Sequence, residues 1–163
     1  KDRWTIYGGG NDIWEASDQF RFVYTEVQGD FSCAVSVDEL LNTHSYAKAG
    51  VMARNSLADH SSHALVNVFP YGNTEFGYRS TDGETMSAIS GLVLPIPGAK
   101  LRLDRKENTI TGMVYVNDRW TKSGSVTISG LNKKIFIGLA TLSHDNNQLT
   151  KAIYSDLKIL QND

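Results

Sequence analysis

In AGVMARNS (residues 49–56), the small apolar residues Val51 and Ala53 alternate with a mixed set, Gly50, Met52 and Arg54. This period of two is typical of a β-strand. Two further runs of this kind follow it closely, HALVNVF (63–69) and EFGYRS (75–80). The apolar positions of the three runs are Val51 and Ala53, then Ala64, Val66 and Val68, then Phe76 and Tyr78. Each run therefore predicts a strand with one face for a core and a second, mixed face.

The same alternation continues on both sides of these runs. FRFVYTEV (20–27), KLRLDRK (100–106) and ITGMVYV (110–116) are further examples, and no stretch of a dozen residues shows a helical stripe. Turn signals separate the runs at Gln28-Gly29-Asp30, Tyr71-Gly72-Asn73, Asp82-Gly83, Glu107-Asn108, Asn117-Asp118 and Asp145-Asn146-Asn147. About a dozen strands in one open sheet would leave long unprotected edges. The sequence therefore predicts an all-β, antiparallel sandwich of two sheets with a jelly-roll architecture.

Composition limits the classes of function. The chain has 163 residues, 40% of them hydrophobic and 21% charged, which suits one globular domain over residues 1–163. A net charge of −2 without a basic block argues against a nucleic-acid partner, and no apolar run is long enough to span a membrane. The single cysteine, Cys33, lies in an alternating run and is expected to be a small buried residue. The abrupt start at Lys1 suggests a monomeric module cut from a larger protein.

The mixed faces of the three runs are the first candidate for a binding surface. If the strands pair as neighbours, Arg54, Asn67 and Arg79 align across one sheet, and Gly50 and Gly77 leave space beside them. Guanidinium and amide groups can donate two hydrogen bonds at once to vicinal hydroxyls or to a carboxylate. This predicts a solvent-facing surface for a sugar, with a slight preference for an acidic or terminal one.

Other residues extend this candidate site. Tyr46 shares the arginine face of its strand, and Trp14 lies in a loop-like setting, so both are expected to offer ring edges against which a sugar can pack. Glu75 shares the mixed face of its strand. The alternative is structural: the arginines solvate the outer face or pair with Glu75 and neighbouring acids, and Trp14 packs into a turn or the core.

Five blocks of the chain also carry a family resemblance. They are WTIYGGGNDIW (4–14), DQFRFVY (18–24), AKAGVMARNSL (47–57), FGYRSTDG (76–83) and IGLATLSHDN (137–146). In this order they resemble the concanavalin A-like, laminin-G-like β-sandwich modules of bacterial secreted proteins, which are appended to polysaccharide-degrading enzymes and surface proteins. The resemblance covers nearly the whole chain, from Trp4 to about Lys158.

The resemblance implies a role and a cofactor. It implies a secreted, non-catalytic carbohydrate-binding module that docks a polysaccharide or oligosaccharide and is attached to a catalytic domain. Modules of this kind often hold a structural calcium ion, and the matching positions here are Asp156 with Asp18 or Asp12. The four histidines do not cluster in the sequence as zinc ligands do, and we interpret them as surface residues.

Two other functions remain open. An interaction or spacer domain would show an apolar patch on its outer faces, fed by Phe69, Phe76 or Leu65. A glycoside hydrolase of this fold would carry paired carboxylates at alternate positions of one strand, and the chain lacks such a motif. The adjacent Asp38 and Glu39 would point to opposite faces, so we do not expect an enzyme.

Overall fold

The computed structural model describes residues 2–162, which fold into strands connected by loops and turns. The strands are β1 (Arg3–Gly8), β2 (Ile13–Trp14), β3 (Ser17–Asp18), β4 (Arg21–Gln28), β5 (Asp30–Leu40), β6 (Lys48–Arg54), β7 (His63–Val68), β8 (Thr74–Arg79), β9 (Ser87–Ser90), β10 (Ala99–Lys106), β11 (Thr109–Val116), β12 (Arg119–Thr127), β13 (Lys134–Leu142) and β14 (Thr150–Asn162). The predicted all-β architecture is confirmed.

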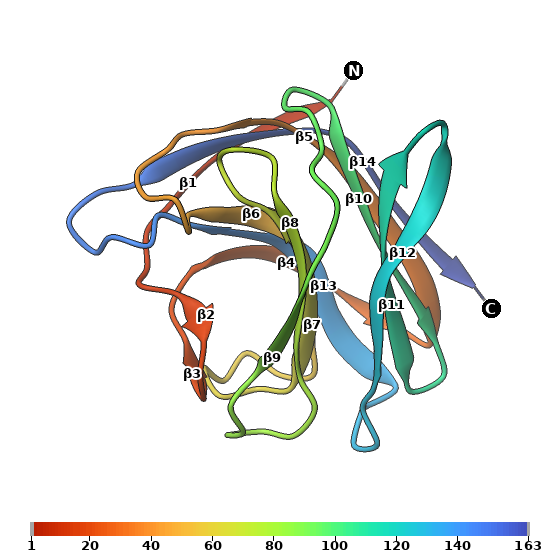
Figure 1. Cartoon of the computed structure of the whole chain (residues 1–163). Helices are drawn as coiled ribbons and strands as arrows, with labels where there is room; N and C mark the ends of the chain where they lie inside the picture. Colours follow the sequence, from red (N-terminus) through yellow and green to blue (C-terminus); the bar gives the residue numbers. More distant parts are fainter. Residues whose placement is uncertain (1, 163) are drawn as a thin grey trace.

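Two six-stranded antiparallel sheets pack face to face (Figure 1). The strand order is β1-β14-β5-β10-β11-β12 in the first sheet and β4-β13-β6-β7-β8-β9 in the second. The strands β6, β7 and β8 are neighbours, as their consecutive positions in the sequence predicted. Their register aligns Val51 with Val66 and Phe76 on the face toward the first sheet.

The core lies between the two sheets and is almost entirely aliphatic. Phe76 on β8 is a fully buried ring that the second sheet contributes to this core, and a Cβ atom added at Gly112 or Gly124 would come within 2.5 Å of this ring. Two glycines in adjacent strands of the first sheet thus make the space that one large side chain fills. Cys33 is buried in the same core, where desolvation raises the pKa of its thiol to about 12.

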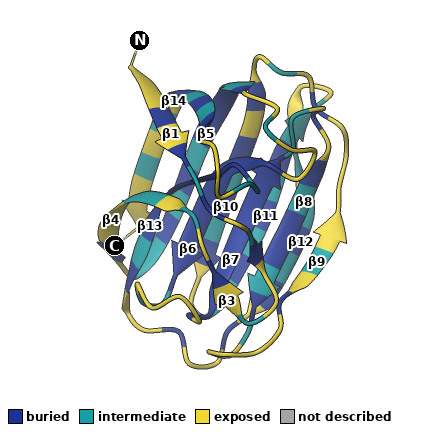
Figure 2. Cartoon of the chain, turned by 90° about the vertical axis from the view of Figure 1, so that its left-hand side faces the viewer, coloured by how far each residue is buried: buried dark blue, intermediate teal, exposed yellow. Residues whose placement is uncertain are grey.

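A third, smaller layer lies outside the second sheet. The hairpin formed by β2 and β3 lies on the side of this sheet that faces away from the first (Figure 1). Every residue of β6 and β7 is consequently buried, on both faces of the sheet (Figure 2). Beneath the hairpin is a second apolar cluster, composed of Ile13, Met52, Leu65, Met86, Ala140 and Leu142.

Residues 2–162 include no helix with the length and apolar character needed to cross a lipid bilayer.

We expect Phe76→Ala to lower the free energy of unfolding by about 3–5 kcal/mol, because the substitution leaves a cavity against two glycines that have no side chains to fill it. Urea denaturation followed by intrinsic fluorescence measures the change. Leu160→Ala is the control, since Leu160 is 60% exposed and its truncation should cost no more than about 0.5 kcal/mol. Equal losses in the two variants would contradict this account of the core.

Candidate functional site

Arg54 and Arg79 lie on the same face of the second sheet, as predicted. The register places Arg54 opposite His63 and His63 opposite Arg79, so the three side chains form one row across β6, β7 and β8. However, Arg54 is only 2% exposed and Arg79 is fully buried. The expectation that these arginines face solvent is therefore wrong, because the β2–β3 hairpin covers them.

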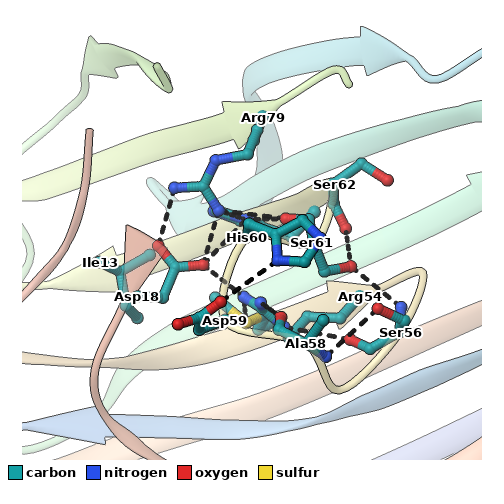
Figure 3. Close-up of polar contacts among 12 residues, drawn as sticks. Ile13, Asp18, Arg54, Ser56, Ala58, Asp59, His60, Ser61, Ser62 and Arg79 are labelled. Atoms are coloured by element: carbon teal, nitrogen blue, oxygen red, sulfur yellow. Dashed lines mark hydrogen bonds and ion pairs between the residues drawn. The ribbon is translucent and has the colours of Figure 1, made fainter. Parts of the chain in front are cut away.

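Asp18, at the end of β3, is the group that fixes the hairpin over this row (Figure 3). Its Oδ2 accepts hydrogen bonds from Arg54 Nη1 and from Arg79 Nη1, both at 2.7 Å, and its Oδ1 accepts one from Arg79 Nη2 at 2.9 Å. One carboxylate is thus shared by two guanidinium groups, and the Asp18 side chain is fully buried.

The remaining donors of the two arginines are also in use. They bond backbone carbonyl oxygens of the surrounding loops: Arg54 to Ser56 and Ala58, and Arg79 to Glu15, Ser61 and Glu84. The Arg54 guanidinium also lies 5.3 Å from the centre of the Phe20 ring. The two arginines therefore connect three loops to the sheet, and each of their guanidinium nitrogens already donates to an acceptor inside the protein. The alternative interpretation, that the arginines pair with an acid and have a structural role, is therefore correct for both, and the acid is Asp18.

Protonation in this cluster follows from burial and charge. Burial alone would raise the pKa of Asp18, but the hydrogen bonds from Arg79 and Arg54 outweigh it, so the pKa lies below its ordinary value. His63 was expected at the surface and is instead fully buried. Although its Nδ1 lies 3.6 Å from Asp18 Oδ2, burial and the two guanidiniums lower the pKa of His63 to about 3. His63 is thus neutral at pH 7.

The face that the hairpin covers at one end opens at the other into a cavity of about 740 Å³. The lining residues come from the hairpin segment, β6, β8, the end of β9 and the loops around them: Asp12, Trp14, Ser45, Tyr46, Lys48, Phe69, Tyr71, Asn73, Thr74, Glu75, Ser90, Gly91 and His144. Segments far apart in the sequence therefore converge on one cavity.

A buried lysine occupies one side of this cavity. Lys48 Nζ lies 2.6 Å from Asp12 Oδ1 and donates a second, longer hydrogen bond to the Ile13 carbonyl oxygen. Asp12 Oδ2 lies 3.5 Å from His144 Nδ1, and burial lowers the pKa of His144 below its ordinary value, so this ring is neutral at pH 7. The Lys48–Asp12 pair thus holds the start of the hairpin to β6 and forms a neutral wall.

Polar groups without protein partners lie at the floor of the cavity, which Glu75 lines, and just beneath it, where Asn67 is fully buried. Glu75 lies opposite Asn67 in the β7–β8 register, and Asn67 lies opposite Gly50. Both side-chain polar atoms of Asn67 and the Oε1 of Glu75 are buried and make no hydrogen bond. Burial raises the pKa of Glu75, although the nearby Lys48 ammonium opposes this shift. Buried polar groups in proteins normally find partners, so this floor is suited to a polar ligand.

Aromatic rings form the rim. Trp14, Tyr46 and Tyr71 are exposed at the cavity, and Phe69 is half-buried between them and the floor. The Tyr46 ring packs edge-on against Phe69, with centroids 5.8 Å apart, and Asn42 Nδ2 donates a hydrogen bond to the Tyr71 hydroxyl. The rim therefore combines flat apolar surfaces with contacts that hold two of the rings in place.

The structure divides the predicted site residues into two groups. Tyr46, Glu75 and Trp14 line the cavity, as does Asp12, which was predicted as a metal ligand. Arg54 and Arg79 do not, and Asn67 lies fully buried beside Glu75. Lys48, Phe69, Tyr71 and His144 were missed as site residues. The alternation of their strands placed Lys48 and Phe69 on the mixed face, which was the available signal, whereas Tyr71 and His144 come from loops.

The carboxylates proposed for calcium do not fit a common site. Asp18 binds two arginines and Asp12 binds Lys48, whereas Asp156 belongs to β14 of the first sheet. Calcium needs six to eight oxygen ligands around one point. Within residues 2–162 no group of three or more His, Cys, Asp or Glu side chains is arranged to hold a metal ion.

Comparisons with known proteins bear on the fold. No protein family model and no curated protein matches the chain. A functionally unknown protein from Saccharomyces cerevisiae has a similar structure, with a TM-score of 0.72 and 17% identity over 98% of this chain and 88% of that one. The GH43 protein BlXynB from Bacillus licheniformis gives a TM-score of 0.70 and 11% identity, over 97% of this chain but only 32% of that one. The carbohydrate-binding module CBM66 from Bacillus subtilis gives 0.56 and 16%, over 98% of this chain and 95% of that one. These similarities confirm the β-sandwich fold.

We expect Asp18→Asn to lower the free energy of unfolding by about 3–5 kcal/mol, because it leaves two buried guanidinium groups without a countercharge. Chemical denaturation measures the loss, and faster amide hydrogen exchange in residues 12–19 would show that the hairpin opens. Asp118→Asn is the matched control, since Asp118 is an exposed turn residue with a φ of 61°, a conformation that asparagine tolerates. A stability of Asp18→Asn equal to that of the control would show that the hairpin does not depend on this carboxylate.

The buried His63 predicts a pH dependence of stability. Below pH 6.5 the unfolded chain binds a proton at His63, whereas the folded chain does not do so until about pH 3. Stability should therefore fall as the pH drops from 6.5 toward 3, with His63 contributing up to about 1.4 kcal/mol per pH unit. The slope of unfolding free energy against pH between 6 and 4 should be shallower in His63→Gln than in the parent protein. Identical slopes would contradict a neutral buried His63.

Proposed function

We propose that this protein is a non-catalytic carbohydrate-binding module and that it binds a glycan in the cavity lined by Trp14, Tyr46, Lys48 and Glu75. One observation carries the proposal: the cavity is lined by exposed aromatic rings and by Glu75, whose buried Oε1 has no protein partner. Binding sites for small organic ligands combine apolar walls with a few convergent polar groups in this way. The cavity lies at the uncovered end of the outer face of β6, β7 and β8, which is the face on which the sequence predicted a sugar-binding site.

A sugar has apolar faces and polar hydroxyl groups, which match the aromatic rings and the polar atoms of the cavity. Its C–H faces can pack on the rings of Trp14, Tyr46 and Tyr71 without needing polar partners. Its hydroxyl groups both donate and accept hydrogen bonds, so they can serve Glu75 Oε1 and the amide of Asn67 if the latter becomes accessible on binding. The rim would supply contact area, whereas the floor would select the pattern of hydroxyls.

The polar groups of the cavity favour binding over hydrolysis. Retaining hydrolysis needs a nucleophilic carboxylate and a separate carboxylic acid on either side of the glycosidic bond. Asp12 and Glu75 are the carboxyl groups among the lining residues, and Asp12 is held by Lys48 at 2.6 Å. A carboxylate that is neutralised by a buried ammonium is a poor nucleophile. We therefore propose no catalytic role for this pair.

The biological setting that we propose follows the family resemblance. The module would be secreted as part of a larger protein and would bring an attached catalytic domain to its polysaccharide. The solved structures that share the fold include a carbohydrate-binding module, a legume lectin-like domain and a GH43 protein of about three times this length, and these are in keeping with such a setting.

An interaction or spacer domain is the competing function. The patch expected for it does not form, since Leu65 and Phe76 are buried and Phe69 lines the cavity. A different feature favours it, a small apolar cleft of about 220 Å³ where the edges of the two sheets meet, lined by Trp4, Tyr24 and their neighbours. Its rings could contact an attached domain, but the cleft lacks the polar groups that would select a sugar.

A polysaccharide panel in affinity electrophoresis or on a glycan array tests the proposal. We expect at least one glycan to bind, and Tyr46→Ala to weaken that binding about tenfold or more, because it removes an exposed ring from the rim. Tyr24→Ala is the matched control, since Tyr24 is similarly exposed but lies on β4, outside the cavity. Both variants should melt within a few degrees of the parent protein.

Three outcomes would count against the proposal. They are no binding to any glycan of the panel, equal binding by Tyr46→Ala and the parent protein, and release of reducing ends from the bound glycan. The panel is also run with EDTA, which should leave binding unchanged because Asp12, one of the two carboxylates of the cavity, is paired with Lys48. Loss of binding in EDTA would support the prediction of a calcium ion.

A further inference from the structure

We propose that the cavity prefers sugars that carry a protonated amino group over neutral and acidic sugars, and that Glu75 is the residue that sets this preference. This inference rests on the proposed function, because it names the class of glycan that the same cavity would take. It reverses the slight preference for acidic sugars that the two arginines suggested in the sequence.

The first support is the balance of charges that face the cavity. The carboxyl and ammonium groups among the lining residues are those of Asp12, Glu75 and Lys48, while His144 is neutral. Lys48 and Asp12 neutralise one another at 2.6 Å. This leaves the carboxyl group of Glu75 without a countercharge, so a ligand with one positive charge would complete the site.

The second support is that the protein itself provides no partner for Glu75. Its neighbours in the sheet register are Asn67 on β7 and Ser90 on β9, and neither donates a hydrogen bond to it. Lys48 contributes electrostatic attraction, but its short contacts are to Asp12 and to the Ile13 carbonyl oxygen. Oε1 of Glu75 is therefore a buried acceptor without a protein donor, on a residue that lines the cavity.

An ammonium group is the donor that suits these surroundings. It brings three N–H donors and a charge, and hydrogen bonds to charged partners are about twice as strong as neutral ones. The walls of the cavity already accept a cation, since Lys48 Nζ lies 5.6 Å from the centre of the Trp14 ring and 5.9 Å from that of Phe69. The exposed rings of Tyr46 and Tyr71 can attract the ammonium of a bound sugar in the same way.

An acidic sugar meets the opposite conditions. Its carboxylate would lie near Glu75 and Asp12, where like charges repel. The guanidinium groups that would pair with it, Arg54 and Arg79, are buried, bind Asp18 and do not line this cavity. Lys48 has one N–H donor beyond those that bind Asp12 and the Ile13 carbonyl oxygen, but its charge is already offset by Asp12 at 2.6 Å. The geometry thus disfavours uronates.

Isothermal titration calorimetry at pH 7 with two matched series of monosaccharides tests the preference. One series is glucosamine, glucose and glucuronate, and the other is galactosamine, galactose and galacturonate. In the series that binds, we expect the amino sugar to bind about fivefold or more tightly than the neutral sugar, and the uronate to bind most weakly. Glu75→Gln should reduce the ratio of amino-sugar to neutral-sugar affinity to about one.

Two further variants act as controls. Glu75→Asp keeps the charge and should keep the preference, which separates the effect of charge from that of a damaged fold. Glu26→Gln removes a carboxylate from the exposed edge strand β4 and should leave the ratio unchanged. The inference is overturned if neutral or acidic sugars bind as tightly as the amino sugar, or if Glu75→Gln keeps the ratio. Either result can occur while polysaccharide binding and its dependence on Tyr46 stand, so failure of the preference is distinct from failure of the proposed function.

Discussion

The bond between Asp18 and the two arginines is the constraint on which the outer half of this molecule depends. Removing a carboxylate and two guanidinium groups from water is costly, and the cost is offset only when each group finds partners of good geometry. Here the carboxylate accepts three N–H hydrogen bonds within 2.9 Å, and carbonyl oxygens of three loops accept further hydrogen bonds from the two arginines. The result is a hairpin of two-residue strands that could not hold its position by sheet hydrogen bonds alone.

The position of this hairpin decides which part of the second sheet can meet a ligand. Over the row that contains Arg54, His63 and Arg79 it closes the face completely. Two rows further along lie Gly50, Asn67 and Glu75, and of these Glu75 reaches the cavity, where the start of the hairpin supplies a wall through Asp12 and Trp14. The ion cluster and the cavity therefore both depend on where the hairpin packs on the second sheet, and a loosened hairpin would alter both.

The sequence predicted the sheets well, because strand periodicity and the pairing of consecutive strands are local properties. It assigned Arg54, Asn67 and Arg79 to one face correctly, but periodicity cannot tell whether another layer covers that face. The strands β2 and β3 are too short to show alternation, and Asp18 lies 36 and 61 residues from the arginines that it binds. Gly77 illustrates the same limit: it was expected to leave open space, and the Met86 side chain occupies that space.

Residue type alone does not separate a structural polar group from one that awaits a ligand. Arginine is the residue that a search for a sugar site would choose first, yet in this fold Arg54 and Arg79 are buried and every one of their guanidinium nitrogens donates to an internal acceptor. Glu75 and Asn67 attract less notice in the sequence, but their buried polar atoms have no protein partners. Since a buried group without a partner lowers stability by about 1–3 kcal/mol, a protein keeps such groups at a cost unless something else supplies the missing hydrogen bonds. Unmet hydrogen-bonding capacity beside exposed aromatic rings is therefore the feature that locates the site, and it arises only once the chain has folded.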